Sequence, residues 1–300
     1  DIDFLLYEFL DTEGLLERPR YSDHSRESFD ATISGVRDIA ANLYANHYQE
    51  GDEHEPLFEN GAVELIPPIK AAWDATVEFG LLGASYDYDE GGVQLPEVIC
   101  KVAGGLIQAA NSGSSGYYFV TNAASNLIRT FGSEQQKSEF LAPMIDGRCT
   151  GTMALTEPSQ GSTLADITTS AHLNADNSYL IRGQKIYISN GDHDLSENIV
   201  HLVLARIEGA PSGTRGISLF IVPKYLVDRD GTTGARNDVA LAGLLHKMGN
   251  KGATSTVLNF GENHGAIGYL VGEPNHGLHC MFQMMNDLRI GVGLGGTALA

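Results

Sequence analysis

The stretch GTMALTEPSQGS, residues 151–162, is the first place where residue types and spacing suggest chemistry. A strand-like apolar run ends in Thr156-Glu157-Pro158, and the small residues Gly161 and Ser162 follow. Proline fixes φ and glycine permits positive φ, so on local grounds alone this is an ordinary turn that ends a strand. Whether this turn has a function beyond ending a strand depends on the motifs found in the rest of the chain.

Two histidine-containing segments are weaker candidates for chemistry. His276 and His279 stand three apart with Cys280 beside them, but no third metal ligand follows at a recognisable spacing. We therefore predict histidines on a helix face and no metal site. In GDHDL, residues 191–195, a histidine lies between two aspartates as in an acid–base pair. Charged loops after a strand are usually only solvated, and we interpret this segment as a loop.

Three glycines near the end of the chain match the G-x-G-x-x-G spacing, namely Gly291, Gly293 and Gly296. A dinucleotide fingerprint needs a strand before the glycines and a helix after them, whereas here a methionine-rich helical pattern precedes them. We expect these small residues to let another helix approach closely. Because no G-x-S-x-G elbow and no P-loop occurs, serine-hydrolase and NTPase functions lack their core motif.

Composition limits the partners. The 300 residues suggest about two domains. The net charge is 19 − 38 = −19, which repels nucleic-acid phosphates and anionic membrane surfaces, so we predict no nucleic-acid or membrane partner. A small anionic ligand remains compatible with this charge, because backbone N–H groups and one local arginine can hold it.

Cysteine usage and the termini indicate the compartment. Cys100, Cys149 and Cys280 are odd in number and widely spaced, which favours buried thiols in a reducing environment. The N-terminal DIDFLLYEFL has no basic region before an apolar run, and no stretch is apolar enough for a membrane span. We therefore predict a cytoplasmic protein. The chain stops at Ala300 within a helical pattern and is expected to be cut short.

Residues 1–147 have helical periodicity and are predicted to form an N-terminal helical domain. Pro67 and Pro68 suit a first helical turn, Ser133 to Gln136 resembles a capping box, and Gly147 suits a C-terminal cap. One apolar stripe recurs at helical spacing through Phe29, Ile33, Val36, Ile39 and Leu43.

Residues 148–272 have the shorter period of strands and are predicted to form a compact antiparallel β domain. ADITTSAHL and SYLIRGQKIYIS flank the turn-rich NADN and predict a hairpin, and further β-branched runs follow. Helical pattern returns over 273–300, where Met281, Met284, Met285 and Leu288 share a face. The fold class is therefore α+β and multidomain.

With this element order, four motifs together resemble the acyl-CoA dehydrogenase family over nearly the whole chain. They are the Thr156-Glu157-Pro158 turn with Gly161-Ser162, GQKIYISNG at 183–191, HKMGNKGATSTVLNF at 246–260, and Arg289 after MFQMMND. The resemblance implies an N-terminal helical domain, a middle antiparallel β-barrel and the start of a C-terminal helical bundle. Several stretches look most like the large-subunit branch typified by 3-methylmercaptopropionyl-CoA dehydrogenase, whose members are longer, so a C-terminal half is expected to be missing.

The resemblance also implies FAD as cofactor, and it implies that the turn at residues 156–162 binds this cofactor. A flavin edge needs backbone amides and hydroxyls at strand ends, and a pyrophosphate needs small residues and a hydroxyl. Tyr187 replaces a tryptophan that packs on the flavin, and Ser189 replaces a threonine whose hydroxyl points toward N5. Ser159 and Gln160 depart from the Gly-Ala of many members. The turn residues expected at the pyrimidine edge are Met153, Leu155 and Thr156, and those expected at the pyrophosphate are Gly161 and Ser162.

The substrate residues implied by the resemblance are Tyr118 and Thr121, bordering the acyl chain, and Arg289, near the cofactor and the floor of the active site. Without the family context, Arg289 is a solvated helix charge. No residue in 1–300 matches the motif of the family's catalytic glutamate, and Glu157 is not given that role. The base is expected beyond Ala300, and residues 1–300 alone are expected to be inactive.

The implied reaction is FAD-dependent α,β-dehydrogenation of an acyl-CoA thioester, a step of fatty acid metabolism, with electrons passed to an electron-transfer flavoprotein. The family further implies a homodimer or homotetramer. Two alternatives stay open on the same scaffold. One is an acyl-CoA oxidase or flavin monooxygenase, and the other is a non-catalytic flavin-binding interaction protein, which the charge of −19 disfavours as a DNA binder.

Overall fold

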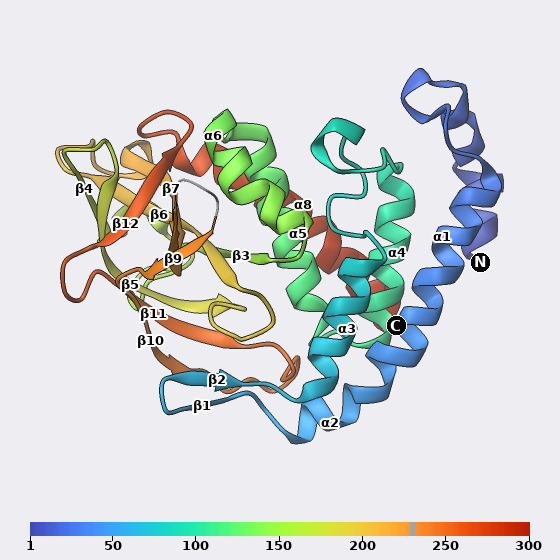
Figure 1. The fold of residues 1–300 in the computed structure, drawn as a ribbon, viewed down its shortest axis with the longest axis horizontal. Coiled ribbons are helices and arrows are strands. Elements are labelled where there is room, and N and C mark those ends of the chain that lie inside the picture. Colours follow the sequence, from blue (N-terminus) through green and yellow to red (C-terminus); the bar gives the residue numbers. More distant parts are fainter. Residues whose placement is uncertain (229–231) are drawn as a thin grey trace.

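The computed structural model describes residues 1–228 and 232–300, with helices on one side and a β-barrel on the other (Figure 1). The predicted N-terminal helical domain is confirmed. Prolines 67 and 68 occupy the first turn of their helix, and a reciprocal capping box joins Ser133 and Gln136. The α-helices are α1 Arg26–Ile39, α2 Tyr48–Glu53, α3 Pro67–Glu78, α4 Glu97–Ala110, α5 Ser115–Phe131, α6 Glu134–Gln136, α7 Ala142–Ile145 and α8 Gly277–Leu299.

A short β-hairpin interrupts the helices, which differs from the expectation of an all-helical first half. Strands β1, Leu57–Glu59, and β2, Ala62–Glu64, pair antiparallel around Asn60 and Gly61. Both turn residues have positive φ, 51° and 81°, as a tight hairpin turn requires. The hairpin contacts β10, Val239–Leu244, and so joins the helical part to the barrel (Figure 1).

Five strands close into a ring in the order β4, β5, β12, β7, β6 and back to β4. The barrel is thereby confirmed, as is the hairpin predicted around NADN. Most pairings are antiparallel, but β6 pairs in parallel with both β3 and β4. Parallel neighbours need a long connection, and long segments of the chain separate both pairs. The further strands are β3 Cys149–Ala154, β4 Ser170–Leu173, β5 Tyr179–Ser189, β6 Asn198–Ile207, β7 Ile217–Pro223, β8 Tyr225–Val227, β9 Thr233–Arg236, β11 Ser255–Phe260 and β12 Ala266–Val271.

Strand β5 serves two parts of the sheet. Its first residues pair with β4 and β12 in the ring, and the residues from Gly183 onward pair with β11. A Cβ on Gly183 would lie 2.5 Å from Thr169 Oγ1 and 2.9 Å from Thr169 Cα, so only glycine lets the strand pass here. The C-terminal end of β5 is thereby carried out of the ring and toward the helices.

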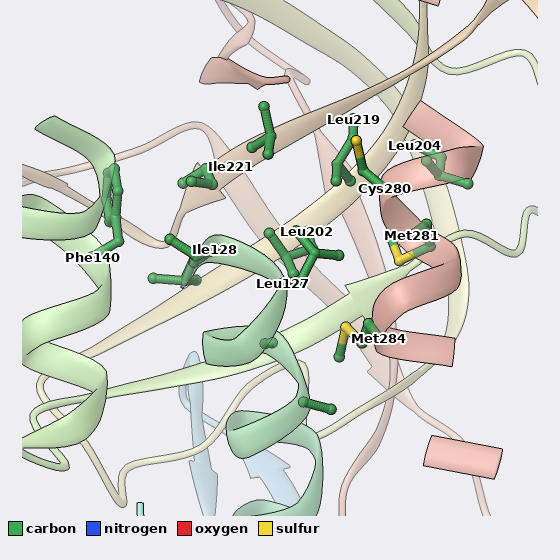
Figure 2. Packing of buried hydrophobic residues seen from close by; sticks show 14 of the residues in the cluster. Leu127, Ile128, Phe140, Leu202, Leu204, Leu219, Ile221, Cys280, Met281 and Met284 are labelled. Carbon is green, nitrogen blue, oxygen red and sulfur yellow. The ribbon is translucent and has the colours of Figure 1, made fainter. Parts of the chain in front are cut away.

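A hydrophobic cluster joins the barrel to α5 and α8 (Figure 2). Leu202 and Leu219 on the strands face Leu127 on α5 and Met281 and Met284 on α8. Each such buried side chain contributes roughly 1.5–3 kcal/mol relative to exposure. The predicted methionine face of the last helix is confirmed, since Met285 and Leu288 also pack against this cluster.

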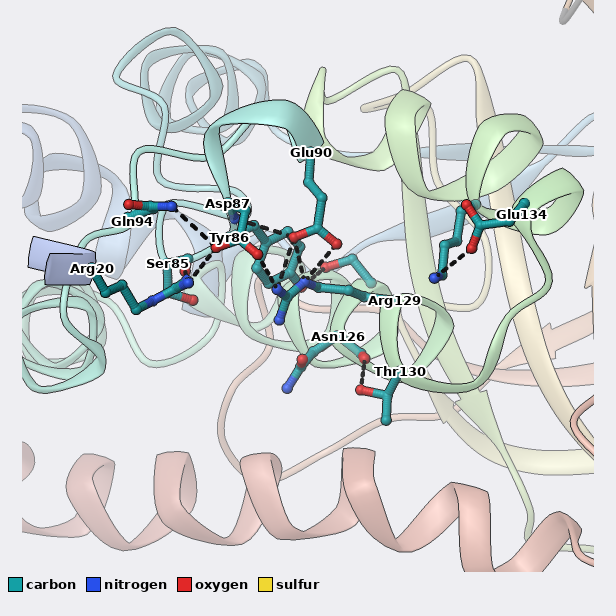
Figure 3. Close-up of polar contacts among 12 residues, drawn as sticks. Arg20, Ser85, Tyr86, Asp87, Glu90, Gln94, Asn126, Arg129, Thr130 and Glu134 are labelled. Carbon is teal, nitrogen blue, oxygen red and sulfur yellow. Dashed lines mark hydrogen bonds and ion pairs between the residues drawn. The ribbon is translucent and has the colours of Figure 1, made fainter.

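An ion-pair network fixes the loop between α3 and α4 on α5 (Figure 3). Arg129 donates from Nε to both carboxylate oxygens of Glu90, at 2.9 and 2.8 Å, and its Nη2 reaches Asp87 at 3.4 Å. Its guanidinium also lies 4.8 Å from the ring centroid of Tyr86, and Arg20 binds Asp87 from the other side. This network ties Arg20 and the loop between α3 and α4 to the helix that packs on the barrel.

The glycines of α8 act differently from the expectation. A Cβ added at Gly293 or Gly296 would meet nothing within 4 Å, and only Gly291 of the three faces a neighbour, Phe119 at 3.4 Å. The close approach is at Gly295, where a Cβ would lie 2.4 Å from the amide of Gln108 on α4. Small residues do let a second helix approach, but at a position outside the three predicted.

All three cysteines are free and buried, as predicted. No group of three or more His, Cys, Asp or Glu side chains that could hold a metal ion occurs within residues 1–228 and 232–300. In the same ranges no helix combines the length and the apolar character needed to cross a membrane.

Candidate cofactor and substrate site

The turn after β3 is a tight reversal anchored to β5. The N–H of Glu157 donates to the carbonyl of Gln160 at 2.7 Å, and the N–H of Gln160 returns a bond to the carbonyl of Glu157 at 3.1 Å. The carbonyl of Thr156 accepts the N–H of Ile186 at 2.9 Å. The two most specific motifs of the sequence are therefore hydrogen-bonded to each other in space.

Glu157 itself is a buried structural anchor. Its carboxylate accepts the N–H and hydroxyl of Thr168 and of Thr169, at 2.6 to 2.9 Å, and lies 3.0 Å from Lys185 Nζ. Burial would raise the pKa of Glu157, but Lys185 and these donors outweigh it and lower the pKa to about 2. A carboxylate with every oxygen engaged is not available as a base, which agrees with withholding that role from it.

Tyr187 and Ser189 lie where β5 leaves the ring. The register between β5 and β11 shifts at Tyr187, leaving it unpaired with φ 60° in a β-bulge. Tyr187 is 54% exposed, and Lys247 Nζ lies 4.5 Å from the centroid of its ring. Ser189 is also exposed and pairs with Ser255. Bulges re-aim side chains next to functional sites, and this one turns an aromatic ring outward.

The other residues predicted for the cofactor surround the same turn. Met153 is partly buried at the end of β3, and the carbonyl of buried Leu155 accepts from Lys185 Nζ at 3.0 Å. Thr156 is partly exposed, and its Cγ2 lies 3.5 Å from the Cβ position of Gly161. Gly161 and Ser162 lie at the surface. The structure thus brings Thr156 and Gly161 together on an open surface.

A cavity of about 230 Å³ opens beside Ser189, between α4, α5, α8 and the loop that precedes β11. Its walls are part apolar and part polar, and none of its lining residues is charged. The lining comprises Gln108, Ser112, Gly113, Ser115, Gly116, Phe119, Val120, Ser189, Asn190, Asn250, Ala253, Leu288, Gly291 and Val292. Of the residues predicted from sequence, this cavity contains Ser189.

The three residues predicted for the substrate lie elsewhere in the structure. Tyr118 is buried in the helical core. Thr121 is buried as well, and its hydroxyl accepts the N–H of Gly151 at 3.2 Å. Arg289 is exposed and donates to Asn286 Oδ1 at 2.9 Å. Their role in substrate binding stays a prediction.

Sequence reasoning missed the neighbours that do line the cavity. On α5 these are Phe119 and Val120, one and two positions along from Tyr118. On α8 they are Leu288, Gly291 and Val292, on either side of Arg289 in sequence. Periodicity finds the apolar face of a helix but not which edge of that face borders a cavity, so no signal in the sequence alone distinguishes them.

The GDHDL segment is a loop, but it is buried rather than solvated except at Asp194, which is exposed. Asp192 pairs with Lys224 Nζ at 2.7 Å. His193 accepts the N–H of Leu195 at Nδ1, at 3.1 Å, and its Nε2 lies 3.0 Å from the hydroxyl of Thr150. Burial, with Lys224 nearby, lowers the pKa of His193 to about 3, so the imidazole is neutral. The segment is thereby anchored to Thr150 at the start of β3 and to Lys224, the residue after β7.

The helical layer, the barrel and the cavity between them define the class of protein, and the comparisons agree. Residues 27–148 match the model described as "Acyl-CoA dehydrogenase, N-terminal domain", and residues 152–262 match "Acyl-CoA dehydrogenase, middle domain". The chain belongs to the acyl-CoA dehydrogenase family.

Among curated proteins, the chain is 42% identical to 3-methylmercaptopropionyl-CoA dehydrogenase of Ruegeria pomeroyi over 280 residues, covering 93% of this chain and 47% of that protein. It is 34% identical to a butyryl-CoA dehydrogenase of Syntrophomonas wolfei, covering 98% of this chain and 50% of that protein. The chain therefore spans about half the length of the curated relatives it matches.

Among solved structures, an acyl-CoA dehydrogenase of Bacillus anthracis complexed with FAD has a TM-score of 0.73 at 25% identity. The match covers 92% of this chain and 43% of that one. The arrangement of helical layer, barrel and following helix is therefore shared with a flavin-bound enzyme.

Proposed function

We propose that the protein binds FAD at the outer end of β5 and catalyses α,β-dehydrogenation of an acyl-CoA thioester. The observation that carries the proposal is the position of Ser189. This residue ends the strand that is hydrogen-bonded to the turn after β3, and it also lines the cavity between the helices. A flavin held along that strand end would meet a substrate in that cavity. The names of the relatives, all acyl-CoA dehydrogenases, support the same reaction.

The residues present fit a flavin. Thr156, Gly161, Ser162 and Ser189 leave hydroxyls and small residues on an open surface, and the ring of Tyr187 is exposed beside them. Bound FAD would supply the hydride acceptor of the reaction. The Ser189 hydroxyl would donate to the flavin edge, the missing side chain of Gly161 would admit the pyrophosphate, and the Tyr187 ring would pack on the isoalloxazine.

Removal of the α-proton needs a base that the cavity walls do not provide. The lining residues of the cavity are uncharged, and the carboxylate of Glu157 is held by Lys185, Thr168 and Thr169. We therefore retain the expectation that the glutamate base lies beyond Ala300. Residues 1–300 alone are then expected to show no turnover.

The electron acceptor and the oligomeric state are proposed from family membership, and the compartment is proposed from the three buried, unpaired cysteines. Electrons are proposed to pass to an electron-transfer flavoprotein, and the protein is proposed to be a cytoplasmic homodimer or homotetramer. An acyl-CoA oxidase or flavin monooxygenase is the second candidate, because the scaffold is shared by these reactions. The reaction of the reduced flavin with oxygen separates the two.

The test is the visible spectrum of the full-length protein, recorded beside residues 1–300. 3-Methylmercaptopropionyl-CoA and butyryl-CoA are added without oxygen. Bleaching of the flavin in the full-length protein alone is the expected result, and slow reoxidation by air would favour a dehydrogenase over an oxidase. A full-length protein that stays colourless and cannot be reconstituted with FAD would overturn the proposal.

A further inference from the structure

The loop at residues 246–252, HKMGNKG, is basic in an acidic chain. It contains no acidic residue, whereas the net charge of the whole chain is −19. The loop leads into β11, whose first residue, Ser255, lies opposite Ser189 on β5. The pairing of these two strands therefore holds the basic loop beside the end of β5, where the flavin is proposed to bind. The basic side chains of the loop are those of His246, Lys247 and Lys251.

Two of these side chains face carboxylates of the helical domain. His246 Nδ1 lies 2.8 Å from Glu55 Oε1. Lys251 Nζ lies 3.6 Å from Asp52 Oδ1 and 3.9 Å from Glu55 Oε1. Within the described part of the chain, Lys247 takes part in no ion pair, and its side chain is exposed. The positive charge of Lys247 is therefore the one in this loop that no carboxylate compensates at close range.

The ammonium of Lys247 lies over the ring of Tyr187. The distance from Nζ to the ring centroid is 4.5 Å, which is within the range of a cation–π contact. Tyr187 is nevertheless 54% exposed with the lysine in place, so the side chain has room for a second neighbour. An aromatic ring has two faces, and the ammonium occupies one of them. A planar group that packs on the other face has a positive charge behind it, on the far side of a single ring.

A positive charge at this position acts differently on the two redox states of a flavin. The isoalloxazine is neutral when oxidised, and accepting a hydride leaves one additional negative charge on the ring system. A nearby fixed charge is one of the means by which a protein tunes this cofactor. The attraction between the ammonium and the additional charge lowers the free energy of the reduced form relative to the oxidised form.

We propose that Lys247 raises the reduction potential of the bound flavin by holding an unpaired ammonium against Tyr187. The inference rests on the proposed function, in which the isoalloxazine packs on the ring of Tyr187. Lys247 is a positioning residue in this scheme, because it contacts the tyrosine and transfers neither a proton nor a hydride. Its effect is to favour the passage of electrons from the acyl-CoA to the flavin.

The test measures the reduction potential of the flavin in the full-length protein, by dye-coupled anaerobic titration without acyl-CoA. Lys247→Met keeps an apolar stem over the tyrosine and removes the charge, whereas Lys247→Arg keeps both the charge and the contact with the ring. We expect the methionine variant to lose about tenfold in the reduction equilibrium, which is a two-electron potential lower by about 30 mV. The effect is limited to this size because the charge is exposed and partly screened by salt. The arginine variant is expected to keep the wild-type potential.

The dissociation constants of oxidised and reduced FAD give a second readout that is independent of turnover. Since binding and reduction are thermodynamically linked, the lower potential of Lys247→Met must appear as weaker binding of reduced FAD alone. We expect that constant to rise about tenfold while the constant for oxidised FAD stays unchanged. A lysine that only held the tyrosine in place would change both constants equally and leave the potential as it is.

Lys137→Met is the matched control, because it removes the same charge from another part of the molecule. Lys137 pairs with Glu134 at 2.9 Å. It follows the C-terminal end of α5, whereas the cavity beside Ser189 borders the N-terminal half of that helix. The potential of this variant is expected to match the wild type. A shift as large as that of Lys247→Met would make the effect one of net charge and would overturn the inference.

Two further results would overturn the inference alone. One is an unchanged potential in Lys247→Met, and the other is a potential that falls as far in Lys247→Arg as in Lys247→Met. A full-length wild-type protein that binds no FAD would overturn the proposed function, and with it the inference. Flavin content and circular dichroism of each variant separate these results from loss of the fold.

Discussion

Lys185 Nζ lies 3.0 Å from Glu157 Oε1, and both side chains are buried where β5 passes the turn after β3. The same lysine donates to the carbonyl of Leu155, and the same glutamate holds Thr168 and Thr169. One ion pair thus fixes the strand, the turn and the following loop to one another. The motif that suggested a ligand-binding turn is rigid because its glutamate faces inward.

Replacing Lys185 by methionine should destabilise the protein strongly, because it leaves the buried carboxylate of Glu157 without a counter-charge. Breaking a buried pair on one side costs about 3–5 kcal/mol. The pKa of Glu157 lies at about 2, below its ordinary 4.5, so its contribution to stability is present above pH 4.5 and is lost as the pH falls toward 2. The deficit of Lys185→Met should therefore shrink in acid.

The measurement is urea unfolding of wild type and Lys185→Met at pH 7.5, above the window of this loss, and at pH 3.5, within it. Lys70→Met is the matched control, because Lys70 and Asp74 form an exposed pair on α3, worth at most about 1 kcal/mol. If Lys185→Met lost no more stability than Lys70→Met, the buried pair would not anchor the turn.

Two buried histidines should make the protein lose stability in mild acid. Burial, with Lys224 as the second cause, lowers the pKa of both His193 and His201 to about 3 from 6.5. Between these values the unfolded chain binds the protons and the folded one does not. Stability is therefore full above pH 6.5 and falls as the pH drops toward 3, by roughly 1.4 kcal/mol per pH unit for each histidine.

Unfolding free energies between pH 7 and pH 4 check this slope. His201→Gln should reduce it, because Gln does not titrate but can still bond to the hydroxyl of Thr152, which lies 2.8 Å from His201 Nδ1. His172→Gln is the control, since His172 is exposed beside Glu208. An unchanged slope in His201→Gln would mean that other groups cause the acid sensitivity.

The elements that sequence predicts here are those whose signals are local. The stripe from Phe29 to Leu43, the methionine face of α8 and the hairpin around NADN follow from periodicity and turn composition. The Asn60-Gly61 dipeptide is an equally local signal for a hairpin turn. The two strands it joins are very short and lie between helical patterns, so periodicity alone does not reveal them. Register, and the choice of β6 as the parallel neighbour of β3, depend on partners far along the chain.

The candidate site likewise has parts that the sequence predicts and parts that it does not. The turn after β3 and the end of β5 are recognisable as motifs, and their hydrogen bond through Thr156 and Ile186 joins them. Burial of GDHDL was not predictable, because Lys224, the partner of Asp192, stands 32 residues away. Gln108 and Asn190 enter the site through the packing of α4 against α8 and the closeness of β11. Neither packing leaves a pattern in the sequence.

Gly151→Ala should weaken the joint between barrel and helices. A Cβ there would lie 2.4 Å from the Cβ of Ala124 on α5 and 2.6 Å from Met144 Cε. Overpacking of this kind costs about 1–3 kcal/mol, measured by chemical unfolding. Gly293→Ala is the control, since nothing lies within 4 Å of that position and the substitution raises helix propensity. Equal stabilities of the two variants would contradict the close approach of α5 to β3.

Ser189→Ala tests the proposed contact with the flavin. If the exposed hydroxyl donates to the flavin edge, its loss should slow flavin reduction by acyl-CoA by roughly tenfold to a hundredfold, because a preorganised donor stabilises charge that develops during hydride transfer. Acyl-CoA affinity should change little. Ser255→Ala is the matched control, since Ser255 pairs with Ser189 across the strands but is buried. Anaerobic stopped-flow reduction of the full-length protein measures the rate, and equal rates in both variants would place the Ser189 hydroxyl away from the reacting atoms.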